Sequence, residues 1–142
     1  MIFEKSEKNS KEKDVLFVYT TCHSLEELRS ISYEAIENKL AISADYWAVG
    51  SIYPWKKVLQ ETDQYMLVFT TEKEFVEKLT KLIESLHSYS VPMIAITDSL
   101  LFNSTYRFWI DSTLHDNNKY LSKHEASMNK EEDGVYHYGK LK

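Results

Sequence analysis

Ser51-Ile-Tyr-Pro-Trp-Lys-Lys57, followed along the chain by Tyr65-Met-Leu-Val-Phe-Thr-Thr71, is the part of the sequence that decides the fold. Two aromatic residues flank a proline in the first segment, and the second has the aromatic and β-branched composition of a strand. The polar residues 56–64 predict a turn region, so we expect a long hairpin. Gly50 favours a bulge or bend in the first strand, and Pro54, which cannot donate a ladder hydrogen bond, favours a strand end or a sheet edge.

Hydrophobic periodicity predicts the other elements on both sides of this hairpin. Nearly continuous apolar runs indicate buried strands, whereas apolar residues at helical spacing indicate amphipathic helices. Ser24 to Glu27 and Thr71 to Glu74 each have the capping-box spacing of a helix start. The expected elements, in chain order, are a strand over 14–21, a helix over 24–40, the hairpin strands over 41–55 and 65–71, a helix over 72–87, a strand over 91–101 and a short helix capped by Asn103 or Ser104.

This βαββαβ order predicts the α+β class and a ferredoxin-like sandwich. Right-handed crossovers put both helices on one face of a four-stranded antiparallel sheet. The strands are nevertheless apolar on both faces, as in Val15-Leu16-Phe17-Val18 and Met66-Leu67-Val68-Phe69. An exposed apolar sheet face of that size is unusual in a monomer. We therefore infer that other subunits bury the second face.

Composition restricts the partners that the chain can have. It has 142 residues, a formal net charge of -5 and only two arginines, Arg29 and Arg107. This charge disfavours nucleic acid, because a phosphate binder needs clustered basic residues. One cysteine rules out an internal disulfide and fits a reducing compartment, and no apolar run reaches the roughly 18 residues of a membrane span. We expect a cytoplasmic protein that binds neither nucleic acid nor membrane.

The length suits one domain, which we expect over residues 14–114, with a polar segment at each end. Residues 1–13 are rich in Lys, Glu, Ser and Asn and predict a flexible N-terminal arm. Residues 115–142 predict a polar C-terminal tail. An alternative for part of the tail is a short edge strand over Val135-Tyr-His-Tyr138.

Four blocks in the expected domain resemble one protein family. They are the Asn38-Lys39-Leu40-Ala41 helix exit, Ser51-Ile-Tyr-Pro-Trp55, Leu86-His-Ser-Tyr-Ser-Val-Pro92 and Tyr106…Trp109-Ile110. In this order they are similar to the CutA family of divalent-cation tolerance proteins. The resemblance implies a ferredoxin-like subunit in a tight homotrimer, with the three sheets facing inward. It also implies a link to metal tolerance, binding of Cu²⁺ or other divalent ions in clefts between subunits, and no firmly established reaction.

The chain departs from the family pattern at several positions. Tyr19 and Ser43 stand where the family often has cysteine, Ser88 replaces the proline of its H-P-Y motif, and Met93 replaces a glutamate. The turn Trp55-Lys-Lys-Val58 also lacks the family's glycine. Because two typical donor positions are lost, a structural or adaptor trimer without metal binding is the alternative to a metal-linked binding and signalling module.

Three residues are candidate metal ligands, namely His87, Cys22 and His23. Imidazole and thiolate suit copper and zinc, and His87 matches the histidine of the family block. The alternatives are a histidine that stabilises a helix C-terminus and a loop thiol without a role.

Three aromatic residues, Tyr53, Trp55 and Tyr89, are candidates for a small-ligand cleft between subunits, and the alternative is subunit packing. Lys56 and Lys57 could hold an anion there, or simply form a solvated turn. No glycine-rich phosphate loop or legible catalytic triad order is present, so we do not expect an enzyme.

Overall fold

The computed structural model describes residues 14–128 of the chain. Its elements confirm the expected α+β class and the βαββαβ order. The four strands are all antiparallel and lie in the order β2-β3-β1-β4, as in a ferredoxin-like sheet. The elements are β1 (Val15–Cys22), α1 (Leu25–Glu37), β2 (Ser43–Trp55), β3 (Val58–Glu72), the 3₁₀ turn η1 (Lys73–Phe75), α2 (Val76–Leu86), β4 (Ile94–Ile96), α3 (Ser104–Leu114) and α4 (Lys123–Met128).

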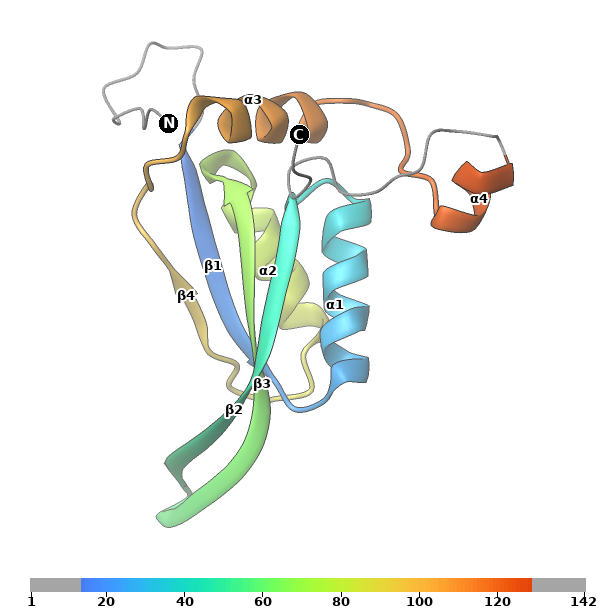
Figure 1. The fold of residues 1–142 in the computed structure, drawn as a ribbon. Coiled ribbons are helices and arrows are strands. Elements are labelled where there is room, and N and C mark those ends of the chain that lie inside the picture. Colours follow the sequence, from blue (N-terminus) through green and yellow to red (C-terminus); the bar gives the residue numbers. More distant parts are fainter. Residues whose placement is uncertain (1–13, 129–142) are drawn as a thin grey trace.

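The main core lies between one face of the sheet and the helices α1 and α2, which pack side by side (Figure 1). Side chains alternate along a strand, so every second residue of β1 and β3 points into this core. A second cluster lies at the end of the sheet that α3 crosses. The main core contains Leu16, Val18, Cys22, Leu28, Ile31, Ala35, Ala41, Leu67, Phe69, Leu79 and Ile83, and the second cluster contains Val15, Ile42, Ile110 and Leu114.

The opposite face of the sheet carries apolar side chains that no helix of the main core covers. Phe17 and Tyr19 of β1 alternate with the core residues of that strand, and their rings lie edge to face, 6.2 Å apart. Trp47 of β2 lies opposite Met66 of β3 and is 47% exposed. The two-sided apolar character expected of the strands is therefore real, and we call these four residues the open face.

The β2–β3 hairpin differs from the predicted one in its turn. The two strands pair without interruption from Ser43 opposite Thr70 to Trp55 opposite Val58. The turn is therefore Lys56-Lys57, with φ of 49° and 68°, and not the whole of residues 56–64. Positive φ at both central residues is the geometry of the tight turn that matches strand twist. The polar sequence misled the prediction because this part of β3 belongs to an arm that projects beyond the rest of the sheet (Figure 1).

Gly50 and Pro54 test two further expectations. Gly50 pairs regularly with Asp63, so the bulge, one of the two predicted alternatives, is wrong, and the bend stays a prediction. Pro54 lies in β2, which is an edge strand, as expected of a residue that cannot donate to a ladder.

The second predicted capping box is also wrong. No side chain caps η1 or α2, and the Thr71 hydroxyl instead donates to the Leu40 carbonyl at 2.7 Å. Thr71 is fully buried, so this bond satisfies a hydroxyl group that water cannot reach. It ties the end of β3 to the loop after α1.

The last strand is shorter than the predicted run over 91–101. Only three residues of β4 form a regular ladder with β1. Beyond them the side-chain hydroxyl of Thr97 accepts from the backbone N–H of Phe17 at 3.0 Å, and the Leu100 N–H donates to the Val15 carbonyl at 2.8 Å. The chain thus continues beside β1, but a side chain replaces one of the ladder acceptors.

Two of the expected terminal features, the arm over 1–13 and the edge strand over 135–138, lie outside the described residues. Within the predicted tail, the described part contains the short helix α4. Ser122 and Glu125 form its capping box, with the Glu125 N–H on the Ser122 hydroxyl at 3.1 Å and the Ser122 N–H on the Glu125 carboxylate at 3.0 Å. Over residues 14–128, none of the helices combines the length and the apolar character that crossing a bilayer requires.

Candidate functional site

The predicted site residues lie where the end of β1, the start of α1 and the loop after α2 meet. His87 is the residue that follows α2, and it joins these elements. Its Nε2–H donates to the Thr21 carbonyl at 2.7 Å, and its Nδ1 accepts from the Tyr89 N–H at 3.1 Å. The two rings of His87 and Tyr89 lie 4.8 Å apart. Both nitrogens of His87 are therefore engaged in hydrogen bonds that fix the loop against β1.

Glu27 is the residue that sequence reasoning missed at this junction. Its carboxylate accepts from the Ser88 N–H at 2.7 Å, from the His23 N–H at 3.2 Å and from His23 Nδ1 at 3.1 Å. The N–H of Glu27 donates to the Ser24 hydroxyl at 3.1 Å, so only half of the predicted capping box forms, and the acid caps His23 instead. Burial opposes ionisation of Glu27, but the hydrogen bonds from Ser88 and His23 outweigh it and lower the pKa to about 2. The spacing of Ser24 and Glu27 signalled the helix start, and nothing local signalled the bond to Ser88.

Cys22 ends β1 beside this network and is fully buried. Burial, with a contribution from the Glu27 charge, raises the pKa of its thiol to about 12. The thiol, the Glu27 carboxylate and the His87 ring nevertheless offer ligand atoms that lie within 4.8 Å of one another. We call Cys22, Glu27 and His87 the junction cluster. The structure thus brings together two of the three predicted metal ligands.

The third predicted ligand, His23, does not belong to the junction cluster. Its side chain is 53% exposed, and its Nδ1 lies 3.1 Å from Glu27 and 3.2 Å from the Ser88 hydroxyl. Adjacent residues of a strand end point apart, so Cys22 turns into the core while His23 turns to solvent. His23 acts on the junction cluster only by orienting Glu27.

The predicted aromatic cleft is also assembled by the fold. Tyr53, Trp55 and Tyr89 line one cavity of about 650 Å³ between the arm and the loop after α2. The Tyr89 hydroxyl donates to the Gln64 side chain at 2.7 Å, and burial raises the pKa of Tyr89. The remaining lining residues are Thr21, Pro54, Gln60, Gln64, Ser88, Ser90, Val91 and Met93.

The chemistry of this cleft follows from its lining. Hydroxyl, amide, aromatic and apolar groups surround it, and among the described residues no charged side chain lines it. Lys56 and Lys57, which could have held an anion, lie at the tip of the arm and not in the lining. The cleft suits a small, largely uncharged or hydrogen-bonding group rather than a phosphate.

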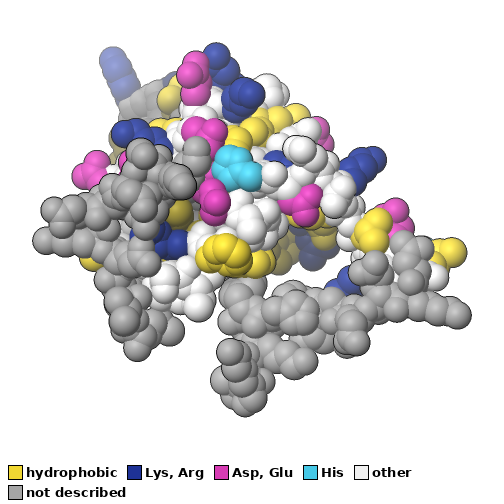
Figure 2. Space-filling model, turned by 90° about the horizontal axis from the view of Figure 1, so that it is seen from above, with side chains coloured by type: hydrophobic (Ala, Val, Ile, Leu, Met, Phe, Trp, Pro, Cys, Tyr) yellow, Lys and Arg dark blue, Asp and Glu magenta, His cyan; other side chains and the backbone are white. Residues whose placement is uncertain are grey.

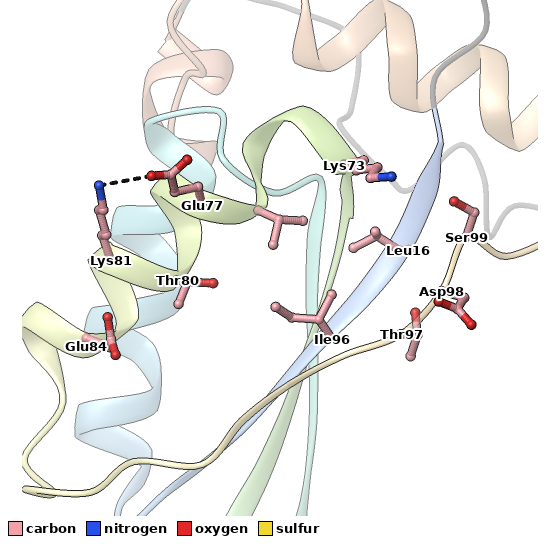
Figure 3. Close-up of a pocket in the computed structure, with 11 residues that line it drawn as sticks. Leu16, Lys73, Glu77, Thr80, Lys81, Glu84, Ile96, Thr97, Asp98 and Ser99 are labelled. Carbon is pink, nitrogen blue, oxygen red and sulfur yellow. Dashed lines mark ion pairs between the residues drawn. The ribbon is translucent and has the colours of Figure 1, made fainter.

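A second groove of about 560 Å³ lies between α2 and the edge strand β4, and none of the predicted site residues lines it (Figure 3). Lys81 and Glu77 form an ion pair of 3.2 Å on its α2 side, while Asp98 and Ser99 lie on the opposite side. The Glu77 and Lys81 side chains are largely exposed, so solvent screens this ion pair.

Comparisons with known proteins agree with this architecture. The family described as CutA1 divalent ion tolerance protein matches residues 16–113. The divalent-cation tolerance protein CutA of Thermococcus kodakarensis is 31% identical over 101 residues, which cover 71% of this chain and 97% of the relative. Among solved structures, the periplasmic divalent cation tolerance protein CutA from Archaeoglobus fulgidus is 25% identical, with a TM-score of 0.69 and coverage of 71% of this chain and 99% of that chain.

The divalent ion tolerance protein CutA1 from Ehrlichia chaffeensis is equally similar in structure. It is 25% identical, with a TM-score of 0.70, and the match covers 73% of this chain and 98% of that chain. All the elements from β1 to α3 fall within or at the limits of the matched residues 16–113, whereas α4 lies beyond them. The chain belongs to the CutA1 divalent ion tolerance protein family.

Proposed function

We propose that this protein is a non-enzymatic homotrimeric binding and signalling module in the response to divalent metal ions. The open face is the observation that carries the proposal. Aromatic residues and methionine are enriched where subunits meet, and Tyr19, Trp47 and Met66 occupy a sheet face that α1 and α2 leave uncovered. Burial against two further copies removes this apolar surface from water.

The arm supports the same assembly. Trp55, near the tip of the arm, is 45% exposed. Ile52 and Leu59 lie on the opposite side of the arm from Trp55 and are 72% and 78% exposed. An isolated two-stranded ribbon gains little stability by itself. A neighbouring subunit against the arm would bury these side chains and explain why the hairpin is so long (Figure 1).

The aromatic cleft adjoins the arm, so the same neighbour would close it. In the proposed trimer a small ligand binds there, between subunits, against Tyr53, Trp55 and Tyr89. Closure by a second chain increases the ligand surface that is buried, which an open cleft on one subunit does not provide.

The junction cluster supplies the proposed copper-binding chemistry. Thiolate and imidazole are the ligands that copper prefers, and Cys22 and His87 offer both beside the Glu27 carboxylate. Binding requires the thiol to lose its proton and the His87 ring to exchange a hydrogen bond for the ion. We therefore expect this cluster to take up only a thiophilic ion.

A structural or adaptor trimer that has lost metal binding is the second candidate function. One observation favours it: the His87 nitrogens and the Glu27 oxygens all have hydrogen-bond partners already. In that case the junction cluster only fixes the loop beside the cleft.

Native mass spectrometry of the untagged protein, with and without Cu²⁺, separates these candidates. A trimer that takes up a whole number of ions per subunit, and loses them in Cys22→Ala and His87→Ala, supports the metal-linked module. A trimer that remains free of copper supports the adaptor. A monomer at micromolar concentration refutes both.

Two further parts of the proposal have their own tests. The absence of catalysis is supported by the lining of the cleft, where the described residues offer hydroxyl and amide groups but no carboxylate, imidazole or amine. Turnover of an acyl phosphate above a heat-killed control would contradict it. The proposed cytoplasmic location is supported by the single cysteine, which is free, and cell fractionation tests it.

A further inference from the structure

A second group of metal-ligating side chains lies about the end of the sheet that α3 crosses, far along the chain from the junction cluster. Glu72 ends β3, Glu74 lies in η1, Asp111 lies in α3, and His115 follows that helix. Nε2 of His115 is 2.7 Å from a Glu72 oxygen, 3.5 Å from a Glu74 oxygen and 3.6 Å from an Asp111 oxygen. We call these four residues the end cluster. Figure 2, which views this end of the molecule, shows a histidine with acidic side chains beside it.

We propose that the end cluster binds a divalent transition-metal ion of the oxygen- and nitrogen-preferring class, such as Mn²⁺ or Zn²⁺, through Glu72, Asp111 and His115. This site is separate from the cleft and from the junction cluster, and it does not rest on the proposed function. The ligand atoms of these three residues all lie within 4.8 Å of one another.

The spacing of the donor atoms fits one shared ion. Ligands at about 2.0–2.2 Å from a metal, separated by tetrahedral or octahedral angles, lie roughly 3.0–3.5 Å from one another. The separations from His115 Nε2 to the carboxylate oxygens run from 2.7 Å to 3.6 Å and bracket that range. Only small movements of the exposed Asp111 and His115 side chains are needed to admit an ion.

Glu72 is the buried member of the end cluster. Its side chain is 1% exposed, and among residues 14–128 only one of its two oxygens has a hydrogen-bond partner, which is His115. A carboxylate has room for about four acceptor contacts, so Glu72 keeps acceptor capacity beyond its bond to His115. Burying such a group is costly unless a charge compensates it.

The charge of the end cluster indicates the charge of the ion that it would bind. The Glu72 and Asp111 carboxylates both lie beside the His115 ring, with oxygens 2.7 Å and 3.6 Å from Nε2. Two carboxylates therefore face one imidazole at this point of the end cluster. A divalent cation neutralises this excess of negative charge, whereas a protonated histidine neutralises only part of it.

The donor set also narrows the class of ion. Carboxylates suit Mg²⁺, Ca²⁺ and Mn²⁺, but an imidazole nitrogen favours Mn²⁺, Zn²⁺ and related ions over the first two. No sulfur ligand belongs to the cluster, because the only cysteine of the chain, Cys22, is in the junction cluster. The Phe75 ring packs 5.7 Å from the His115 ring, and this contact limits its rotation.

Isothermal titration of the full chain with Mn²⁺ and with Zn²⁺ tests the proposal, with Mg²⁺ as the comparison ion. We expect one Mn²⁺ per subunit, bound more tightly than Mg²⁺. Asp111→Asn and His115→Ala should each raise Kd by at least about tenfold, because each removes one ligand. Electron paramagnetic resonance of bound Mn²⁺ gives a second readout, since loss of a ligand changes the spectrum.

The matched control is His124→Ala, which removes an exposed histidine of α4. This variant should not change the Mn²⁺ affinity. If the junction cluster does not bind copper, the Mn²⁺ result still stands, because copper binding is tested separately with Cu²⁺ and Cys22→Ala.

Two results would overturn the inference. One is a wild-type Kd for Mn²⁺ and Zn²⁺ above about 1 mM, and the other is equal affinity in wild type, Asp111→Asn and His124→Ala. If His115→Ala loses its far-ultraviolet circular dichroism signal, Asp111→Asn decides, because Asp111 is 53% exposed and its amide replacement keeps the shape of the side chain.

Discussion

Replacing Glu27 by glutamine tests how firmly the loop that lines the cleft is held. The carboxylate of Glu27 joins the start of α1 to Ser88, which lies 61 residues further along the chain. Glutamine keeps the shape and one acceptor oxygen, but it loses the negative charge and puts an N–H₂ group near the Ser88 or His23 donor. We therefore expect Glu27→Gln to destabilise the protein and to loosen the loop after α2.

The size of the effect follows from the pKa of Glu27. Lowering the pKa from 4.5 to about 2 corresponds to roughly 3 kcal/mol of folding free energy at neutral pH. The side chain is only 7% exposed, so solvent screens these hydrogen bonds little. Because glutamine keeps one acceptor, we expect a loss of about 2–3 kcal/mol in the free energy of unfolding.

The pH dependence has a definite sign. The pKa of Glu27 is lower in the folded than in the unfolded chain, so its stabilisation is complete above about pH 5. It is lost as the pH falls from there through about 2, because protonation then removes the charge in both states. The difference between wild type and Glu27→Gln should therefore shrink on acidification.

Urea unfolding at pH 7 and at pH 2.5 measures this difference, at one protein concentration because assembly also contributes to stability. Glu26→Gln is the matched control: it removes an exposed acid from the same first turn and should cost no more than about 0.5 kcal/mol. Equal effects of the two variants at pH 7, or an unchanged difference at pH 2.5, would refute the reasoning.

Three further variants test the arm, the turn and the buried threonine. Trp55→Ala should weaken assembly, because the residue is a 45% exposed aromatic near the tip of the arm; an unchanged oligomer mass and unfolding midpoint would contradict this. Lys57→Gly should raise the free energy of unfolding by about 1 kcal/mol, since φ is 68° there, and a lower stability would argue against the left-handed turn. Thr71→Val should lower it by about 1–3 kcal/mol by leaving the Leu40 carbonyl unpaired, and a change under about 0.5 kcal/mol in urea unfolding would be inconsistent with that bond.

The sequence predicted the fold where one physical signal dominated. β1 and the second half of β3 are apolar because they lie in the centre of the sheet, so their composition is distinctive. The first half of β3 is polar because it lies in the projecting arm, where both of its faces are largely exposed to solvent. Composition cannot separate such a strand from a loop. The Lys57 turn shows the same limit, because a glycine would have marked it and a lysine adopts the same φ there.

The candidate site was predicted in part, and the omissions have a common cause. His87 was predicted because imidazole suits copper and zinc and because it matches the histidine of the family block, and Cys22 was predicted because a thiolate suits the same ions. Glu27 was interpreted as a helix-start acid, and its bond to Ser88 spans 61 residues, which no local pattern records. The end cluster was missed for the same reason, although the i, i+4 spacing of Asp111 in α3 and His115 at the end of that helix was a readable signal.

Within the junction cluster, variants of His87 and Cys22 differ in how they can be interpreted. His87 holds Thr21 and Tyr89 by hydrogen bonds, so His87→Ala disturbs the wall of the cleft even if no ion ever binds. Cys22 is a better probe, because its buried thiol has no hydrogen-bond partner in the described chain and alanine fits the space it leaves. Copper uptake that disappears in His87→Ala but persists in Cys22→Ala would therefore indicate a change in the loop and not the loss of a ligand. Uptake that disappears in both variants, while the trimer and the Mn²⁺ affinity remain, identifies the junction cluster as the copper site.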